Sequence, residues 1–286
     1  MADSQPTSSL ELLEKAFALT PVEAGLSSLM LEEFSNAPQQ LPPEKGFPFG
    51  GLLAALCAKA MRQGLDIDTP LQTLSVQYLA AANYGQSLLF TPQMLRNGRQ
   101  ITYAAVQAAQ GERLTHNASG TFGRPSLNTA GLYDRVVPPP ALDSIPVGVG
   151  MQGPFAPRFA QHAEYRFDGG PNLFGGNKDG KRIERCWIRM RDGQPLDEIR
   201  LCYLLDALYP PSWTGFETPP VMTTVDLRYD FLTAPTVENA PDGWAYFEYR
   251  LIQHSEGWAV DEAMAWGADG SVLATSRQRR KVLGRT

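Results

Sequence analysis

Hydrophobic and polar positions alternate along most of the chain, which indicates antiparallel strands rather than a helical protein. In the first half this pattern predicts strands over Met30–Phe34, Leu71–Leu79, Ser87–Arg96, Thr102–Gln110 and Leu114–Phe122. In the second half it predicts strands over Ala163–Phe167, Arg182–Met190, Thr224–Phe231, Ala245–His254, Ala259–Gly267 and Val272–Val282. Gly and Asn-Gly turns between several of these segments favour short hairpins.

Two segments are apolar on nearly every side of a helix, Phe49–Gln63 and Pro195–Leu208. A helix without a polar face is buried all round, so we expect both to lie inside the fold. A further short amphipathic helix is predicted to begin at the capping box of Ser8 and Glu11 and to end near Thr20.

The two halves repeat one another. Thr73–Tyr78 parallels Thr224–Tyr229, and each half combines one apolar helix with a run of strands. A Pro-rich stretch separates them. We therefore predict an α+β protein of the double-hotdog class, with two central helices each wrapped by a curved antiparallel sheet. The expected boundaries are 1–123 for the N-terminal hotdog, 124–160 for the linker and 161–286 for the C-terminal hotdog.

Composition narrows the possible partners. A formal net charge of −5 and a pI near 5.3 argue against nucleic acid, which requires a basic face. The N-terminal residues lack the pattern of a secretory signal, and no apolar run has the length of a membrane span. We therefore expect a cytoplasmic protein. Cys57, Cys186 and Cys202 are too few and too scattered for a disulfide framework.

Metal and serine-nucleophile chemistry find no support in the sequence. His116, His162 and His254 are isolated and lack ligand spacing. No Gly-x-Ser-x-Gly elbow is present. We expect neither a metal nor a separate cofactor.

Asp206 is the most informative single residue, because it interrupts the apolar stretch of the second buried helix. A buried carboxylate without partners is strongly unfavourable, so this side chain requires hydrogen bonds. An exposed structural Asp near a helix end is the alternative that the local sequence leaves open.

Four motifs together resemble the bacterial thioesterase II family of acyl-CoA thioesterases. The segment from Trp187 to Pro210 is similar to that family's strand and helix leading to a catalytic Asp. Met222-Thr-Thr-Val-Asp226 resembles its strand with a catalytic Thr, and Val272–Gln278 resembles the motif that ends in a catalytic Gln. Phe49-Gly50-Gly51 resembles the Phe-Gly-Gly of its first central helix.

This resemblance implies that Asp206, Thr224 and Gln278 hold a water that attacks a thioester. Asp206 is the expected base, and the other two side chains fix the same water. The N–H groups at Gly50 and Gly51 are expected to face the substrate carbonyl as an oxyanion site. Taken singly, Thr224 and Gln278 are also ordinary strand residues, and the glycines are compatible with close packing alone.

The implied substrate is an acyl-CoA, with CoA as part of the substrate rather than a cofactor. Its tail is expected in an apolar tunnel beside Tyr203 and Leu204. Arg277 and Arg279, within the basic run that continues to Lys281, are candidates for the CoA phosphates, although such a run is often a solvated edge. Sheet edges that pair between chains make a homodimer or homotetramer the expected assembly.

Two other functions on the same fold stay open. A hotdog dehydratase or hydratase uses a His with a carboxylate, and no His here lies in such a context. A non-catalytic acyl-CoA-binding protein is the second alternative. Leu205 and Leu227 depart from the family's usual residues, and this leaves the acyl length undetermined.

Overall fold

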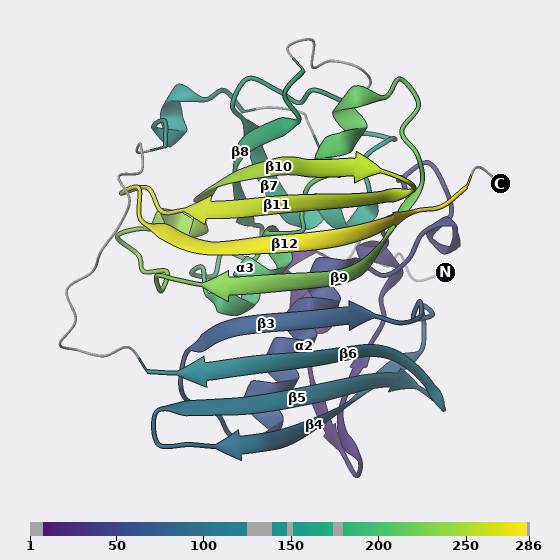
Figure 1. Cartoon of the computed structure of the whole chain (residues 1–286), viewed down its shortest axis with the longest axis vertical. Helices are drawn as coiled ribbons and strands as arrows, with labels where there is room; N and C mark the ends of the chain where they lie inside the picture. Colours follow the sequence, from purple (N-terminus) through teal and green to yellow (C-terminus); the bar gives the residue numbers. More distant parts are fainter. Residues whose placement is uncertain (1–7, 125–138, 148–150, 174–179, 285–286) are drawn as a thin grey trace, which may run out of the picture.

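A computed structural model describes residues 8–124, 139–147, 151–173 and 180–284. Its central feature is one twelve-stranded sheet in the order β1-β2-β4-β5-β6-β3-β9-β12-β11-β10-β8-β7 (Figure 1). The first-half strands are β1 (Thr20–Val22), β2 (Gly25–Leu29), β3 (Leu71–Tyr78), β4 (Ser87–Asn97), β5 (Ile101–Gln110) and β6 (Arg113–Gly123). The second-half strands are β7 (Ala163–Phe167), β8 (Ile183–Met190), β9 (Met222–Phe231), β10 (Ala245–Ser255), β11 (Trp258–Trp266) and β12 (Val272–Val282).

The two halves join where β3 pairs with β9 in the middle of the sheet (Figure 1). Val76 lies opposite Leu227 in this antiparallel pair. These are the very residues that the sequence repeat makes equivalent, three positions after Thr73 and Thr224 respectively. Equivalent residues facing one another across an antiparallel pair indicate a local two-fold relation between the halves.

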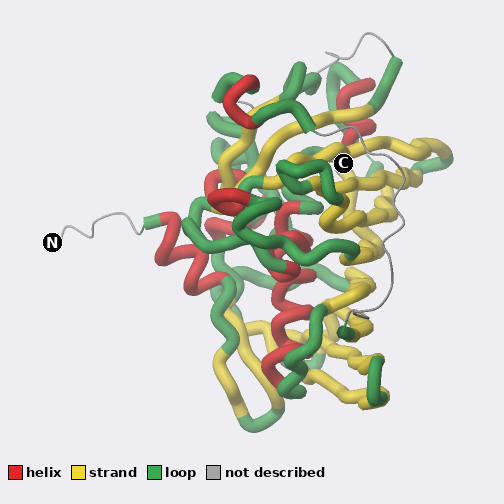
Figure 2. The backbone as a smooth tube through the Cα atoms, turned by 90° about the vertical axis from the view of Figure 1, so that its left-hand side faces the viewer, coloured by secondary structure: helices red, strands yellow, loops and turns green. Residues whose placement is uncertain are grey.

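Three α-helices occur in the described ranges: α1 (Ser9–Ala16), α2 (Gly50–Gly64) and α3 (Glu198–Leu204). Figure 2 shows helices gathered on one face of the sheet. α2 contacts β2 to β6 and also α3, and most of its residues are buried. Phe49, at the start of α2, stacks on Phe159 of the linker with ring centroids 3.8 Å apart. Most residues of α2 and the last four residues of α3 are buried.

One predicted strand is wrong, and the bounds of one predicted helix are wrong. Met30–Phe34 is not a strand: β2 ends at Leu29, and Glu32–Phe34 forms a 3₁₀ turn with both glutamates exposed. The strand was missed because its inward position 28 carries a polar Ser28, which breaks the apolar alternation. The second buried helix does not span Pro195–Leu208; Asp197 caps α3 through a 2.7 Å bond from the Arg200 N–H, and α3 ends at Leu204.

Residues 139–147 of the linker pack on the outer face of the second half. Leu142 and Ile145 lie against a cluster of Trp187, Trp244 and Tyr246. The Trp187 indole N–H donates to the Pro140 carbonyl at 3.0 Å. Within the described ranges, no helix has the length and apolarity needed to cross a bilayer.

Candidate active site

Asp206 lies in the turn that follows α3 rather than within the helix. Its backbone N–H donates to the Tyr203 carbonyl at 3.3 Å, and that of Ala207 donates to Leu204 at 3.1 Å. The residue is only 8% exposed. The expectation of a buried carboxylate is confirmed, and the alternative of an exposed Asp is wrong.

Hydroxyl groups from four strands hold this turn in place by donating to backbone carbonyls of the turn and of the end of α3. The bonds are Tyr165 to Ala207 at 2.9 Å, Tyr229 to Cys202 at 2.9 Å, Ser276 to Leu205 at 3.4 Å, and Tyr249 to Leu204. The last carbonyls of a helix have no partner within the helix, and leaving them buried without one is costly. The strands of the second half therefore fix the position of Asp206 through the backbone on either side of it.

The carboxylate of Asp206 faces the N-terminus of α2. Among the residues that the structure describes, no side chain caps this helix, whose N-cap residue is Phe49. A Cβ atom on Gly50 would lie 2.9 Å from Asp206 Oδ2, and one on Gly51 would lie 2.7 Å from the Tyr203 carbonyl oxygen. Glycine at these positions lets the Asp206 carboxylate and the end of α3 approach the start of α2 this closely. The free N–H groups and the helix dipole favour an anion here.

Thr224 reaches the site because of a β-bulge. Leu227 is buried and paired with Gln278, so regular alternation from Leu227 would turn Thr223 inward and Thr224 outward. The register between β12 and β9 shifts after the Arg279–Asp226 pair, so that Arg280 lies opposite Thr224. The extra residue, Val225, reverses the alternation and brings the Thr224 hydroxyl to the inner face.

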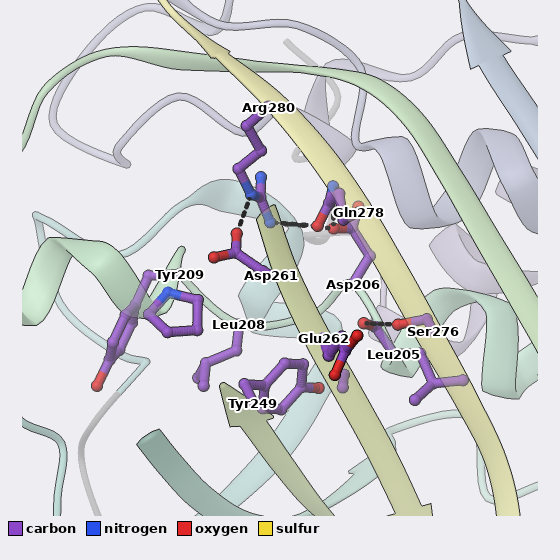
Figure 3. Close-up of a pocket in the computed structure, with 12 residues that line it drawn as sticks. Leu205, Asp206, Leu208, Tyr209, Tyr249, Asp261, Glu262, Ser276, Gln278 and Arg280 are labelled. Atoms are coloured by element: carbon purple, nitrogen blue, oxygen red, sulfur yellow. Dashed lines mark hydrogen bonds and ion pairs between the residues drawn. The ribbon is translucent and has the colours of Figure 1, made fainter. Parts of the chain in front are cut away.

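Gln278 joins the other two predicted residues. Its Nε2 donates to Asp206 Oδ1 at 3.0 Å and to Thr224 Oγ1 at 2.6 Å. Figure 3 shows the Asp206, Gln278 and Arg280 side chains meeting beside β12. Residues from the turn after α3, from β9 and from β12 are therefore in direct contact, although as many as 72 positions separate them.

The pKa of Asp206 is raised to about 6, and burial is the largest cause. The charge of Arg280, the amide of Gln278 and the backbone N–H of Gly51 each lower this pKa and so oppose burial. Asp261 raises it through like-charge repulsion. The balance leaves a carboxylate that is ionised at neutral pH and is basic enough to accept a proton.

Arg280 and Asp261 complete the site, and the sequence reasoning did not find them. Arg280 Nε donates to Asp261 Oδ2 at 2.6 Å, and Asp261 lies opposite Gln278 across β11 and β12. A signal was present in the sequence, because Arg280 is two residues from Gln278 and so shares its sheet face. Asp261 is likewise two residues from both Ala259 and Ala263 of β11, which are buried, so it shares their face of the sheet.

A pocket opens beside these polar groups (Figure 3). One part of its lining is polar, with Asp206, Asp261, Gln278 and Arg280. The remainder is largely apolar and is formed by Leu205, Leu208, Tyr209, Pro211, Tyr249 and Ala263, together with Glu262 and Ser276. Tyr203 and Leu204, expected beside an acyl tunnel, are fully buried and are not among these lining residues.

Arg277 and Arg279 are exposed, and they alternate with the inward-facing Gln278 and Arg280. Arg277 pairs with Glu262 at 3.4 Å, and the Arg279 guanidinium lies 5.1 Å from the centre of the Trp258 ring. A CoA phosphate bound by these two arginines would therefore lie on the outer face of the sheet.

The sequence matches the family profile of the acyl-CoA thioesterase C-terminal domain over residues 137–279, and that of the N-terminal domain over residues 37–123. A search of curated protein sequences gives no significant match.

Solved structures with similar folds share low sequence identity with the chain. A hot dog fold protein of unknown function from Alicyclobacillus acidocaldarius has a TM-score of 0.81 and 22% identity, covering 96% of this chain and 99% of that chain. The tesB protein of Mycobacterium avium subspecies paratuberculosis has a TM-score of 0.75 and 15% identity, with coverages of 97% and 100%. An acyl-CoA thioesterase II from Mycobacterium marinum has a TM-score of 0.71 and 15% identity, with coverages of 96% and 99%.

Proposed function

The chain belongs to the acyl-CoA thioesterase family, and we propose that it hydrolyses acyl-CoA thioesters by means of a water held by Asp206, Thr224 and Gln278. One observation carries the proposal: the Gln278 amide bridges the Asp206 carboxylate and the Thr224 hydroxyl next to the uncapped start of α2. These groups supply a proton acceptor, two orienting groups and nearby backbone N–H donors in one place.

The proposed reaction has two steps. In the first, Asp206 takes a proton from the water while the water oxygen attacks the thioester carbonyl carbon. The negative charge that forms on the carbonyl oxygen is stabilised by the N–H groups in the first turn of α2, at Gly50 and at Gly51, whose N–H also faces Asp206. In the second, the carbon–sulfur bond breaks, and the leaving CoA sulfur takes the proton from Asp206. The products are the free acid and CoA.

The proposal includes an architecture. We take α2 and α3 as the central helices of two hotdog units, because each is buried and lies under strands of its own half. The boundaries at 1–123, 124–160 and 161–286 stay predictions, as do the homodimer or homotetramer and the phosphate-binding role of Arg277 and Arg279. Light scattering at micromolar concentration tests the assembly, and a monomeric mass would contradict it.

A dehydratase or hydratase requires a His beside the acid, and the described residues favour hydrolysis instead. His116 bonds to Thr115 at 2.9 Å, and His162 bonds to Ser9 at 3.0 Å. His254 has no hydrogen bond to Asp206 among the described contacts. The carboxylate is partnered by an amide and a guanidinium, which suits a role in positioning water.

The test is thiol release from a panel of acyl-CoAs that differ in chain length, with the free acid measured in parallel. We expect equal amounts of thiol and acid from at least one member of the panel. Tight binding without hydrolysis would identify a binding protein. Hydration of an enoyl-CoA without thiol release would identify a hydratase.

A further inference from the structure

The Arg280 guanidinium contacts every residue of the proposed water site. Its Nη1 lies 3.4 Å from Thr224 Oγ1, its Nη2 lies 3.7 Å from Asp206 Oδ1, and its Nη2 also donates to Gln278 Oε1. Its Nε donates to Asp261 (Figure 3). The side chain is only 12% exposed, so these contacts form in surroundings where charge is weakly screened.

The Gln278 amide has two possible orientations of similar shape, and only one of them suits the site. In the observed orientation, Nε2 faces Asp206 and Thr224 while Oε1 faces Arg280. A flipped amide would place Oε1 against the carboxylate and Nε2 against the guanidinium. Both contacts would be repulsive, so the cation on one side and the anion on the other select one orientation.

Asp261 in turn selects the orientation of the guanidinium. It is buried, and its Oδ2 accepts from Arg280 Nε at 2.6 Å. An arginine held through Nε presents its two terminal nitrogens in a fixed plane. Those nitrogens are the groups that meet Gln278 and Thr224. A lysine would supply the charge but not this planar set of donors.

From this geometry, and on the basis of the proposed thioesterase activity, we propose that Arg280, oriented by Asp261, is a positioning residue that fixes the Gln278 amide and keeps Asp206 ionised. It acts through Gln278 and Asp206 rather than on the reacting atoms. The sequence placed it in a basic run with Arg277 and Arg279, but it lies on the opposite face of the strand from both.

Ionisation of Asp206 depends on groups from each element packed around it. Arg280 and Gln278 come from β12, Asp261 from β11 and the Gly51 N–H from α2. Phenols of four tyrosines also surround it and stay neutral, since burial raises the pKa of each well above its usual value: Tyr78, Tyr203, Tyr229 and Tyr249. Arg280 and Asp261 are therefore the charged side chains that set the protonation of Asp206, and their effects have opposite signs.

The experiment compares the pH dependence of kcat/KM for wild type, Arg280→Gln, Arg280→Lys and Asp261→Asn. Arg280→Gln removes the cation that favours ionised Asp206, so the acid limb of the pH profile, where kcat/KM falls as Asp206 is protonated, is expected to move up by at least about one pH unit. Arg280→Lys keeps the charge, so its limb stays near that of wild type while kcat falls roughly 10- to 100-fold through lost orientation. Asp261→Asn keeps an acceptor for Arg280 but removes an anion, so its limb moves down. Arg228→Gln, an exposed change on β9, is the matched control and is expected to behave as wild type.

A second measurement does not depend on activity. The pKa of the Asp206 carboxyl is followed by ¹³C NMR, with Asp206→Asn identifying its signal, in wild type and in each variant. If wild type hydrolyses no acyl-CoA, the proposed function fails, yet the NMR titration still tests the role of Arg280. An unmoved Asp206 pKa in Arg280→Gln, wild-type kcat in Arg280→Lys, or loss of all activity in folded Asp261→Asn would each overturn the proposal. The last result would point to Asp261 itself as the base.

Discussion

Replacing Asp206 with Asn is expected to stabilise the folded protein at neutral pH, even though it removes the proposed base. The pKa of this carboxyl is raised by burial from 3.8 to about 6. Ionising it in the folded protein is therefore harder than ionising it in the unfolded chain. Asn resembles the protonated acid in shape and charge, so the variant is spared this cost.

The size of the effect follows from the two pKa values. The destabilisation of wild type by ionised Asp206 is absent well below pH 3.8, grows between pH 3.8 and 6, and is complete above pH 6. Its full value is about 3 kcal/mol, and a little under half of it develops between pH 5 and pH 7. The stability of Asp206→Asn relative to wild type should therefore increase with pH over this window.

Urea denaturation at pH 5 and pH 7 measures this difference. Asp226→Asn is the matched control, because this residue is exposed on the β9 strand. The difference in unfolding free energy between this variant and wild type should not show the same increase from pH 5 to pH 7. A pH-independent difference for Asp206→Asn, or one that grows toward acid, would refute the reasoning. Either result would mean that burial does not raise the pKa of this carboxyl.

Four further single changes probe the same site. Thr224→Val and Gln278→Ala should each lower kcat roughly 10- to 100-fold with smaller changes in KM. In steady-state kinetics, the double variant should lose less kcat than the product of the two single losses. A loss equal to that product would argue against a shared water. Tyr229→Phe leaves a buried carbonyl without its donor and should cost about 1–3 kcal/mol by urea denaturation, whereas the exposed Tyr103→Phe should cost little. Gly50→Ala places a Cβ atom 2.9 Å from Asp206 Oδ2 and should lower kcat in a protein that still folds. A kcat equal to that of wild type would contradict the close approach of the Asp206 carboxylate to Gly50.

Most strands were predictable because their inward positions are apolar and their outward positions polar. The pattern failed where the inward residue is polar, as at Ser28 in β2. It also could not locate the end of α3. That helix stops at Leu204 because strand hydroxyls take its last carbonyls, such as Tyr229 bonding to Cys202, and these long-range partners leave no mark in the local sequence.

The sequence named the three residues that meet in the candidate site. Asp206 stood out already by its place in an apolar stretch, whereas Thr224 and Gln278 were found only through the resemblance and not through strand geometry. Regular alternation would have favoured Thr223 over Thr224, and the bulge at Val225 reverses that choice. Arg280 and Asp261 were accessible to the same alternation argument, since both share the inner face with Gln278. They were missed because Arg280 sits in a run of basic residues that is typical of a solvated strand edge.

The central claim is that Asp206 takes the proton from the attacking water, and the kcat of Asp206→Asn tests it most directly. Thiol release is measured with the best acyl-CoA of the panel, and circular dichroism verifies that the variant is folded. Loss of the proton acceptor should reduce kcat roughly 10²- to 10⁴-fold. A folded Asp206→Asn protein with the kcat of wild type would contradict the account and would place the base elsewhere in the pocket.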